Sequence, residues 1–174
     1  MDKDREALAQ QVQEASDRVR SGASEMEEIA LPNNSVLRIR RAEDGSGRVI
    51  VEADRDGVTL RSVPFEAADS RPSDFPDDLP FLPRAAGTLS QAGEKHARTM
   101  VWPSAPEPVA GFASLRAEIT KLGWEEVGVS EEVSEDGDIQ SVDFSRGEAL
   151  RSLFLQKVGD RAQLMVVDHP PKDD

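Results

Sequence analysis

Apolar side chains recur at alternating spacings of four and three residues near the start of the chain. The positions that share this spacing are Leu8, Val12, Ala15, Val19, Gly22, Met26 and Ile29. A repeat of about 3.5 residues is the period of a coiled-coil seam, so the pattern predicts an amphipathic helix over 1–30. Ser21-Gly22 is a place where this helix can end or kink, because glycine is a poor helix former.

This apolar stripe has two interpretations. Such stripes usually pack on the core of their own domain. The alternative is a helix that pairs with another subunit, by self-association or with a protein partner. In that case Leu8, Val12, Val19 and Met26 are the candidate contact residues.

A pattern with a period of two residues follows. It predicts strands over 35–41, 48–54 and 58–63, joined by turns rich in Asp and Gly, and so a three-stranded antiparallel meander over 31–63. Alternation places Arg38, Arg40 and Arg61 on one face, with Glu52 between them. This face is either a solvated ladder of cross-strand ion pairs or a patch that meets an acidic partner or lipid headgroups.

Prolines and acidic residues interrupt the pattern over 64–83. Proline removes backbone donors and the acids repel one another, which predicts an extended linker or surface strap between two units. The apolar residues that would attach the strap to a neighbouring surface are Phe75, Leu79, Phe81 and Leu82.

Residues 84–168 predict a second unit that contains a helix and several strands. The strands are expected over 86–91, 97–102, 124–129, 138–145, 149–157 and 161–168. The helix covers 109–122 and ends at Gly123; an acidic loop covers 131–138, and 169–174 form a disordered tail. The predicted fold class is therefore α+β: an N-terminal helix, a three-stranded antiparallel meander, and then a helix packed on an antiparallel sheet.

Several short motifs lie in and just before this second unit. They are Asp78-Leu79-Pro80, Pro83-x-Ala85, Leu122-Gly123-Trp124, Phe144-Ser145-Arg146-Gly147 and Leu153-x-Leu155. With these motifs, residues 78–168 resemble a small α+β domain of uncharacterised bacterial proteins, several of which are similar to envelope or lipoprotein components. The resemblance implies packing and turn roles for the motifs and supplies no catalytic residue.

Charge and composition narrow the functional classes. The chain of 174 residues carries 34 acidic and 21 basic side chains, a formal net charge of -13, which opposes binding to nucleic acid phosphates. The absence of cysteine excludes disulfides, cysteine nucleophiles and thiolate metal sites. No apolar run is long enough for a transmembrane segment, and the charged start has no signal-peptide core. The expected location is the cytoplasm, or the cell envelope if a signal or anchor was removed.

Signals for catalysis and for cofactors are missing. The nucleophile-elbow, P-loop and dinucleotide-binding motifs do not occur. His96 and His169 stand apart from other ligand types, so we expect exposed histidines without a role. Asp54-x-Asp56-Gly57 and Asp136-Gly137-Asp138 are fragments of calcium loops that are better explained as turns, although the acids of 131–138 leave a loosely held divalent cation as an alternative. We expect no cofactor, no metal and no enzymatic activity.

The two tryptophans bracket the predicted helix of the second unit. Core packing is the expected role of Trp102 and Trp124. The sequence as a whole predicts a non-enzymatic protein-interaction or structural subunit of a bacterial assembly. One alternative is a carrier of a small ligand or lipid, with a cleft near Trp102, Trp124 and Phe144. Another is an acidic inhibitor or immunity-type protein for a basic target.

Overall fold

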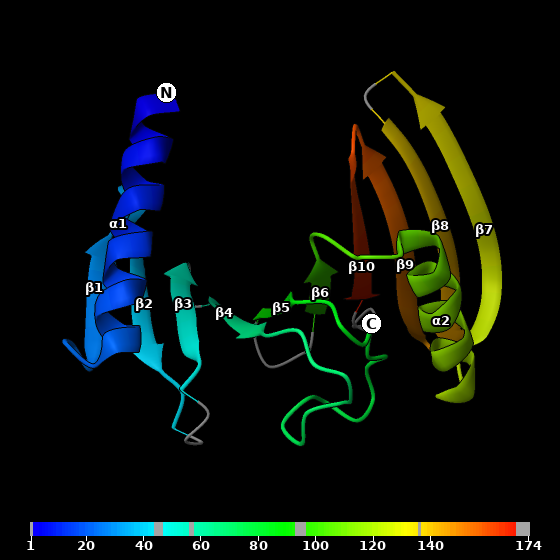
Figure 1. Ribbon diagram of the computed structural model, residues 1–174, viewed down its shortest axis with the longest axis horizontal. Coiled ribbons are helices and arrows are strands. Elements are labelled where there is room, and N and C mark those ends of the chain that lie inside the picture. Colours follow the sequence, from blue (N-terminus) through cyan, green and yellow to red (C-terminus); the bar gives the residue numbers. More distant parts are fainter. Residues whose placement is uncertain (1, 44–46, 56–57, 93–96, 136, 170–174) are drawn as a thin grey trace. The chain divides into compact units, whose positions relative to one another are not determined.

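The computed structural model describes residues 2–43, 47–55, 58–92, 97–135 and 137–169 (Figure 1). The chain forms two compact units. Unit 1 comprises Met1–Pro64 with Ser90–Glu94, and unit 2 comprises Phe65–Leu89 with Lys95–Asp174.

Unit 1 is a helix packed on antiparallel strands. Its elements are helix α1 (Asp2–Ser21), strand β1 (Met26–Ala30), a 3-10 turn (Pro32–Asn34), and strands β2 (Val36–Arg41), β3 (Val49–Arg55) and β4 (Val58–Phe65). Neighbouring strands pair in chain order, β1 with β2, β2 with β3 and β3 with β4. The strands expected from the two-residue period are therefore present, within a few residues of their predicted bounds.

The first helix is shorter than the spacing of apolar residues predicts. It ends at Ser21, and Gly22 follows with a φ of 86°, a left-handed conformation that favours glycine. Residues 26–30 form strand β1, in which Glu27 and Ile29 are half-buried while Met26, Glu28 and Ala30 are exposed. Met26 and Ile29 are three residues apart, so they would share one face of a helix but point to opposite faces of a strand, in which Ile29 is the half-buried one.

The stripe of α1 packs on the sheet of its own unit. Ala15 and Val19 of α1 form a buried cluster with Ile39 of β2 and Val49 of β3. The half-buried apolar residues around this cluster are Val12, Ile29, Leu37 and Val51. In Figure 1, α1 lies over one face of the strands of unit 1, roughly along their direction. This is the intradomain packing that was the first interpretation of the stripe.

Unit 2 contains the second helix and the longest strands. Its elements include strand β6 (Ala97–Trp102), helix α2 (Pro108–Lys121) and strands β7 (Glu125–Ser134), β8 (Gly137–Arg146), β9 (Ala149–Val158) and β10 (Arg161–His169). Strand β5 (Gly87–Ala92) begins in unit 2 and ends in unit 1. Leu115 and Ile119 of α2 are fully buried. Gly123 follows α2 with a φ of 94°, as its predicted capping role requires.

Apart from Pro64, the strap predicted over 64–83 belongs to unit 2, and its apolar residues attach it there. Phe75, Leu79, Phe81 and Leu82 are buried. The Phe75 ring makes edge contacts with Phe65 and Phe81, at centroid distances of 5.2 and 5.5 Å. Edge-to-face pairs add to the stability that burial of the rings provides.

Strand β7 extends through part of the segment predicted to be an acidic loop. It continues to Ser134 and pairs with β8, with an irregular register between Glu126 and Gly128. The loop prediction was therefore wrong for residues 131–134. A glutamate-rich edge strand keeps its acidic side chains in water, so their charge is no obstacle to strand pairing.

The predicted fold class is wrong. Instead of a three-stranded meander followed by a helix on a small separate sheet, the described residues form one ten-stranded antiparallel sheet in the order β1-β2-β3-β4-β5-β6-β10-β9-β8-β7, with two helices. The sequence predicted most of the strands and the hairpin neighbours β2, β3 and β4, but not β1 and not the distant pairing of β6 with β10. Backbone N–H and C=O groups are the same in every strand and carry no label for a distant partner.

The two units share one order of elements. A helix is followed by four antiparallel strands, α1-β1-β2-β3-β4 in unit 1 and α2-β7-β8-β9-β10 in unit 2. A glycine of positive φ follows each helix, and the next strand, β1 or β7, is terminal in the strand order. The repeat is not evident in the sequence because it lies in element order and turn geometry rather than in residue identity.

Candidate functional site

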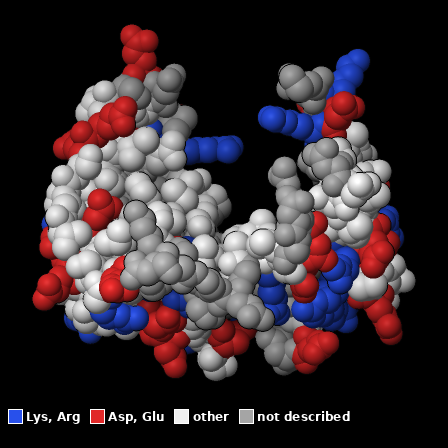
Figure 2. Space-filling view, turned by 180° about the vertical axis from the view of Figure 1, so that it is seen from behind, with Lys and Arg blue, Asp and Glu red and all other residues white. Residues whose placement is uncertain are grey.

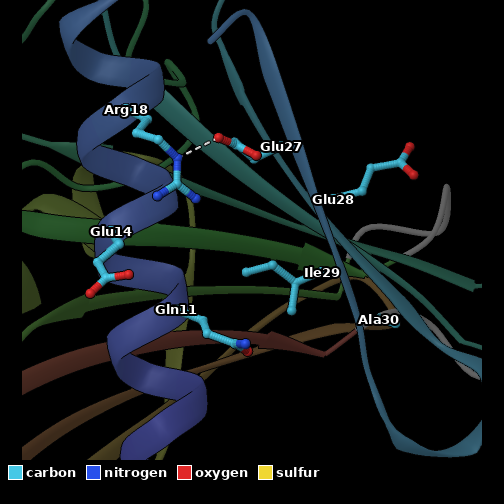
Figure 3. A pocket seen from close by; sticks show the side chains of 7 residues that line it. All are labelled: Gln11, Glu14, Arg18, Glu27, Glu28, Ile29 and Ala30. Atoms are coloured by element: carbon cyan, nitrogen blue, oxygen red, sulfur yellow. Dashed lines mark hydrogen bonds and ion pairs between the residues drawn. The ribbon is translucent and has the colours of Figure 1, made fainter. Parts of the chain in front are cut away.

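A groove lies between α1 and the edge strand β1 of unit 1 (Figure 3). Its volume is about 470 Å³. The residues that line it are Gln11, Glu14 and Arg18 of α1 and Glu27, Glu28, Ile29 and Ala30 of β1. Helix and strand thus form two walls of one groove.

Helical periodicity places the α1 residues of the groove together. Gln11, Glu14 and Arg18 are three and four residues apart, a spacing that puts side chains on one face of a helix. From β1, Glu27 and Ile29 point toward α1, whereas Glu28 points away from it (Figure 3). An occupant of the groove would therefore meet polar side chains from the helix and one apolar side chain, Ile29, from the strand.

One ion pair joins the two walls. Nε of Arg18 donates to Glu27 at 2.5 Å, and the Ser24 hydroxyl donates to the same carboxylate at 2.9 Å. The hydrogen bond from Arg18 is the main reason why the pKa of Glu27 lies below its ordinary value, and the hydrogen bond from Ser24 lowers this pKa further. Among the described residues, Glu14 and Glu28 have no ion-pair partner. Arg18, the arginine that lines the groove, is already paired with Glu27. The carboxylates of Glu14 and Glu28 therefore make the rim of the groove acidic.

Strand β1 is also the first strand in the order of the sheet, with β2 as its neighbour. A terminal strand presents a row of backbone N–H and C=O groups that can pair with another extended chain. The groove lies beside this strand. The site therefore offers main-chain hydrogen bonds together with side-chain contacts.

Four of the seven predicted partner-binding residues lie together on the other face of the same sheet. Met26 is directly across from Arg40, and Glu52 is directly across from both Arg38 and Arg61. Because residues directly across from each other share a face, and alternate residues of one strand do as well, Met26, Arg38, Arg40 and Arg61 share the face opposite α1.

The arginines of that face belong to a cross-strand ladder. Arg38 pairs with Asp54, and Arg40 donates to Glu52 at 2.8 Å. Figure 2 shows this side of the molecule, with basic and acidic side chains next to one another over unit 1. Met26 is 50 % exposed, and Arg61 is exposed as well. The paired charges make this face balanced rather than basic.

The other three predicted residues lie on α1. Val19 is fully buried, and Val12 and Leu8 are half-buried. Val12 and Val19 pack on the core of unit 1, so they stabilise the helix that forms one wall of the groove. The groove itself was not predicted from the sequence. A polar face of a helix next to an edge strand leaves no signal until the strand order is known.

Unit 2 contains a buried ionic cluster that the sequence analysis missed. Arg151 is fully buried and makes two hydrogen bonds to Asp168, at 2.5 and 3.0 Å. Arg98 donates to Asp168 at 2.9 Å and to Asp78 of the strap at 2.5 and 3.1 Å. Trp124 covers Arg151, with the guanidinium carbon 4.4 Å from the ring centroid. The cluster connects the strap to the sheet of unit 2.

The signal for this cluster was present but subtle. Arg151 is in phase with Leu153 and Leu155, two buried residues of β9, so its side chain belongs to the inner face of the strand. A charge at an inward position requires a partner, because an unpaired buried charge is costly. Its partner, Asp168, stands directly across from it on β10.

We expect protonation of Asp78 to weaken the attachment of the strap. Hydrogen bonds from Arg98 hold the pKa of Asp78 below its ordinary value of 3.8, although burial opposes them. Because the pKa is lower in the folded chain, this contact stabilises the fold above the ordinary value and is lost as the pH falls through the folded-state pKa. The wild-type chain should therefore lose part of its free energy of unfolding between about pH 6 and about pH 3, and Asp78→Asn should make this loss smaller. Urea unfolding followed by tryptophan fluorescence at each pH measures the effect.

Asp77 provides the matched control for this experiment. It is the exposed neighbour of Asp78 on the same strap. Asp77→Asn should retain the pH dependence of the wild-type chain. If Asp78→Asn also retained it in full, the ion pair with Arg98 would not contribute to acid sensitivity.

The remaining predicted sites fall into two groups. His96, Asp56, Gly57 and Asp136 lie outside the described residues. Within them, His169 is exposed, and Asp54 accepts a hydrogen bond from Thr59 and pairs with Arg38. In the described part of the chain, no three His, Asp or Glu side chains gather as a metal site would need, and no helix is long and apolar enough to cross a membrane.

The aromatic residues proposed for a ligand cleft lie in the core of unit 2. Trp102 is 1 %, Trp124 4 % and Phe144 0 % exposed. A second groove, of about 180 Å³, lies near the start of α2 in the same unit. It is lined by Leu82, Pro83, Arg84, Ala105, Pro106, Glu107, Ala110, Gly111 and Ser114. These three rings do not line it, and its volume is below the range of about 300–1,000 Å³ that is usual for small-molecule sites.

The motifs on which the sequence analysis based a resemblance to a small bacterial domain contain buried and turn residues. Leu79 of the strap and Ala85 just after it are buried, Leu153 and Leu155 are buried in β9, and Gly147 has the positive φ of a turn. Comparison of the chain with protein-family models, with curated proteins and with solved structures gives no match.

Proposed function

We propose that this chain is a non-enzymatic protein-interaction subunit that binds an extended segment of a partner protein along β1. The observation that carries the proposal is the groove of about 470 Å³ between α1 and the terminal strand of the sheet. In this mode of recognition the backbone of the partner continues the sheet, and pockets for alternate side chains provide specificity.

The geometry of β1 defines what the partner segment should contain. Ile29 points toward α1, so the partner residue beside it should be apolar and should enter the groove. Glu28 points to the opposite face and has no ion pair among the described residues, so the partner residue beside it should be basic. On the side of the groove, Glu14 of α1 provides a further carboxylate. The proposed ligand is an extended segment that alternates apolar and basic residues.

Charge favours a different protein over a second copy of the chain. Symmetric pairing of two β1 strands about their middle residue would place Glu28 of one copy across from Glu28 of the other. Like charges directly across two strands are destabilising. Each copy also carries a formal net charge of -13. A basic segment of another protein avoids both repulsions.

Site-specific photocrosslinking tests the proposal in the organism that encodes the chain. Benzoylphenylalanine replaces Gln11, which lines the groove, or Gln13, which is exposed on another face of α1. We expect light to join one defined segment of one protein to position 11 and not to position 13. Glu28→Lys should lower the crosslink yield about two- to ten-fold, because it replaces an attraction with a repulsion.

Glu43→Lys is the matched charge control, since Glu43 is exposed and lies outside the groove. It should leave the yield unchanged. Equal products from positions 11 and 13, or no product from position 11, would contradict the proposal.

A further inference from the structure

Strand β7 of unit 2 exposes apolar side chains along a sheet edge. It is the last strand in the order of the sheet, with β8 as its neighbour. Val127, Val129 and Val133 are 59 %, 68 % and 72 % exposed. They account for three of the eight large hydrophobic side chains that are exposed in the described part of the chain. Exposed apolar side chains that gather on one strand indicate a contact surface.

Val129 is the exposed end of a row of apolar side chains that runs across neighbouring strands and is otherwise buried. It lies directly across from Val142, which pairs with Leu153, which in turn pairs with Val166. The last three are at most 1 % exposed, whereas Val129 is 68 % exposed. One further strand beside β7 would place a side chain next to Val129 and continue the row. The register from Gly128 to Ser134 is regular, so the edge there can accept such a strand.

The charge of β7 determines which kind of strand would fit. Its four charged residues are all glutamates, and Arg116 of α2 already holds Glu126 at 2.5 Å. Glu131 and Glu132 have no ion pair within the described residues. Alternation places Glu131 between Val129 and Val133 on one face. A complementary strand therefore carries a basic residue between two apolar ones, spaced two residues apart.

A second copy of the chain fits this edge poorly. Two β7 strands would bring eight glutamates into one pairing, counted as four from each copy, and supply no basic residue. Like charges on adjacent strands oppose pairing. A basic and apolar segment of another protein satisfies both the valines and the carboxylates.

We propose that β7 is a second strand-addition site, which binds an extended partner segment with a basic residue between two apolar residues. The two repeats of helix and four strands would each bind through the first strand after the helix. This inference concerns a different edge from β1, and it stands whether or not β1 binds a partner.

Backbone amide NMR of the full-length chain tests the proposal. One probe is a synthetic peptide that alternates valine with lysine; a second has glutamate in place of lysine, and a third has the lysine sequence with alternate backbone nitrogens methylated. We expect the lysine peptide to shift the amide signals of residues 128–134. The methylated peptide should not shift them, because methylation removes the N–H groups that a new strand needs. Shifts at 26–30 report on β1 separately, so failure at one edge is distinguishable from failure at the other.

Two charge variants complete the test. Glu131→Lys should weaken binding of the lysine peptide at β7 about two- to ten-fold, whereas Glu148→Lys, at an exposed turn, should not. No shift at β7, or equal binding of the lysine and methylated peptides, would overturn the site. Equal binding of the lysine and glutamate peptides would overturn its preference for a basic partner. Dimerisation with protected β7 amides would overturn it in favour of a second copy.

Discussion

Asp168→Ala is expected to lower the free energy of unfolding by about 3–5 kcal/mol, because it leaves a buried charge without its partner. Arg151 is fully buried, and both of its hydrogen bonds among the described residues go to Asp168. Arg98 also donates to Asp168, and in this variant Asp78 would be the carboxylate that still accepts hydrogen bonds from it. Urea unfolding followed by tryptophan fluorescence measures the effect in unit 2, where both Trp102 and Trp124 lie.

Two further variants separate the lost charge partner from a general effect of mutation. Asp160→Ala removes an exposed carboxylate from the turn before β10 and should change stability by less than about 0.5 kcal/mol. Arg151→Met combined with Asp168→Leu removes both charges and should cost less than Asp168→Ala, since a buried pair can often be replaced by apolar residues. A loss below about 1 kcal/mol for Asp168→Ala would show that Arg151 does not depend on this carboxylate.

Ile39→Ala is expected to destabilise unit 1 by about 2–5 kcal/mol, the usual cost of a cavity in a core. Ile39 is fully buried and packs with Ala15 and Val19 of α1 and with Val49. Its truncation should weaken the packing of α1, the helix that forms one wall of the groove, on the sheet. Hydrogen exchange measured by mass spectrometry should therefore show faster exchange in peptides from α1 and β2.

Leu60→Ala provides the control for this second prediction. Leu60 is in the same set of strands but is 45 % exposed, so its truncation should change exchange little. If Ile39→Ala left the protection of α1 unchanged, the helix would not depend on the sheet for its position. The strand-addition site would then lack a fixed wall.

Binding and stability are connected in unit 1 through the two faces of α1. The buried face, with Ala15 and Val19, attaches the helix to the sheet. The adjacent polar face, with Gln11, Glu14 and Arg18, lines the groove. Because one rigid helix carries both faces, core packing determines the width of the groove beside β1. Variants that test binding should therefore change the polar face alone.

Most of the local structure follows from residue patterns along the chain. Alternation marked the strands from β2 onward, since it depends on side-chain direction along a single strand. Gly123 was placed at a helix end and Gly147 in a turn motif, and both have the positive φ that such positions favour. The apolar residues of the strap were expected to be attached, and Phe75 and Leu79 are buried.

Which strands lie at the edges of the sheet and which charges are buried depends on the three-dimensional arrangement of the chain. The sequence did not show that residues 26–30 leave the helix to form β1, or that β7 continues to Ser134. It also did not show that Arg151 of β9 pairs with Asp168 of the neighbouring strand β10. Strand pairing and burial depend on contacts between residues far apart in the chain, whereas periodicity reports on neighbours only. The groove beside β1 and the open edge of β7 arise from that long-range pairing, so both proposed sites became visible with the strand order.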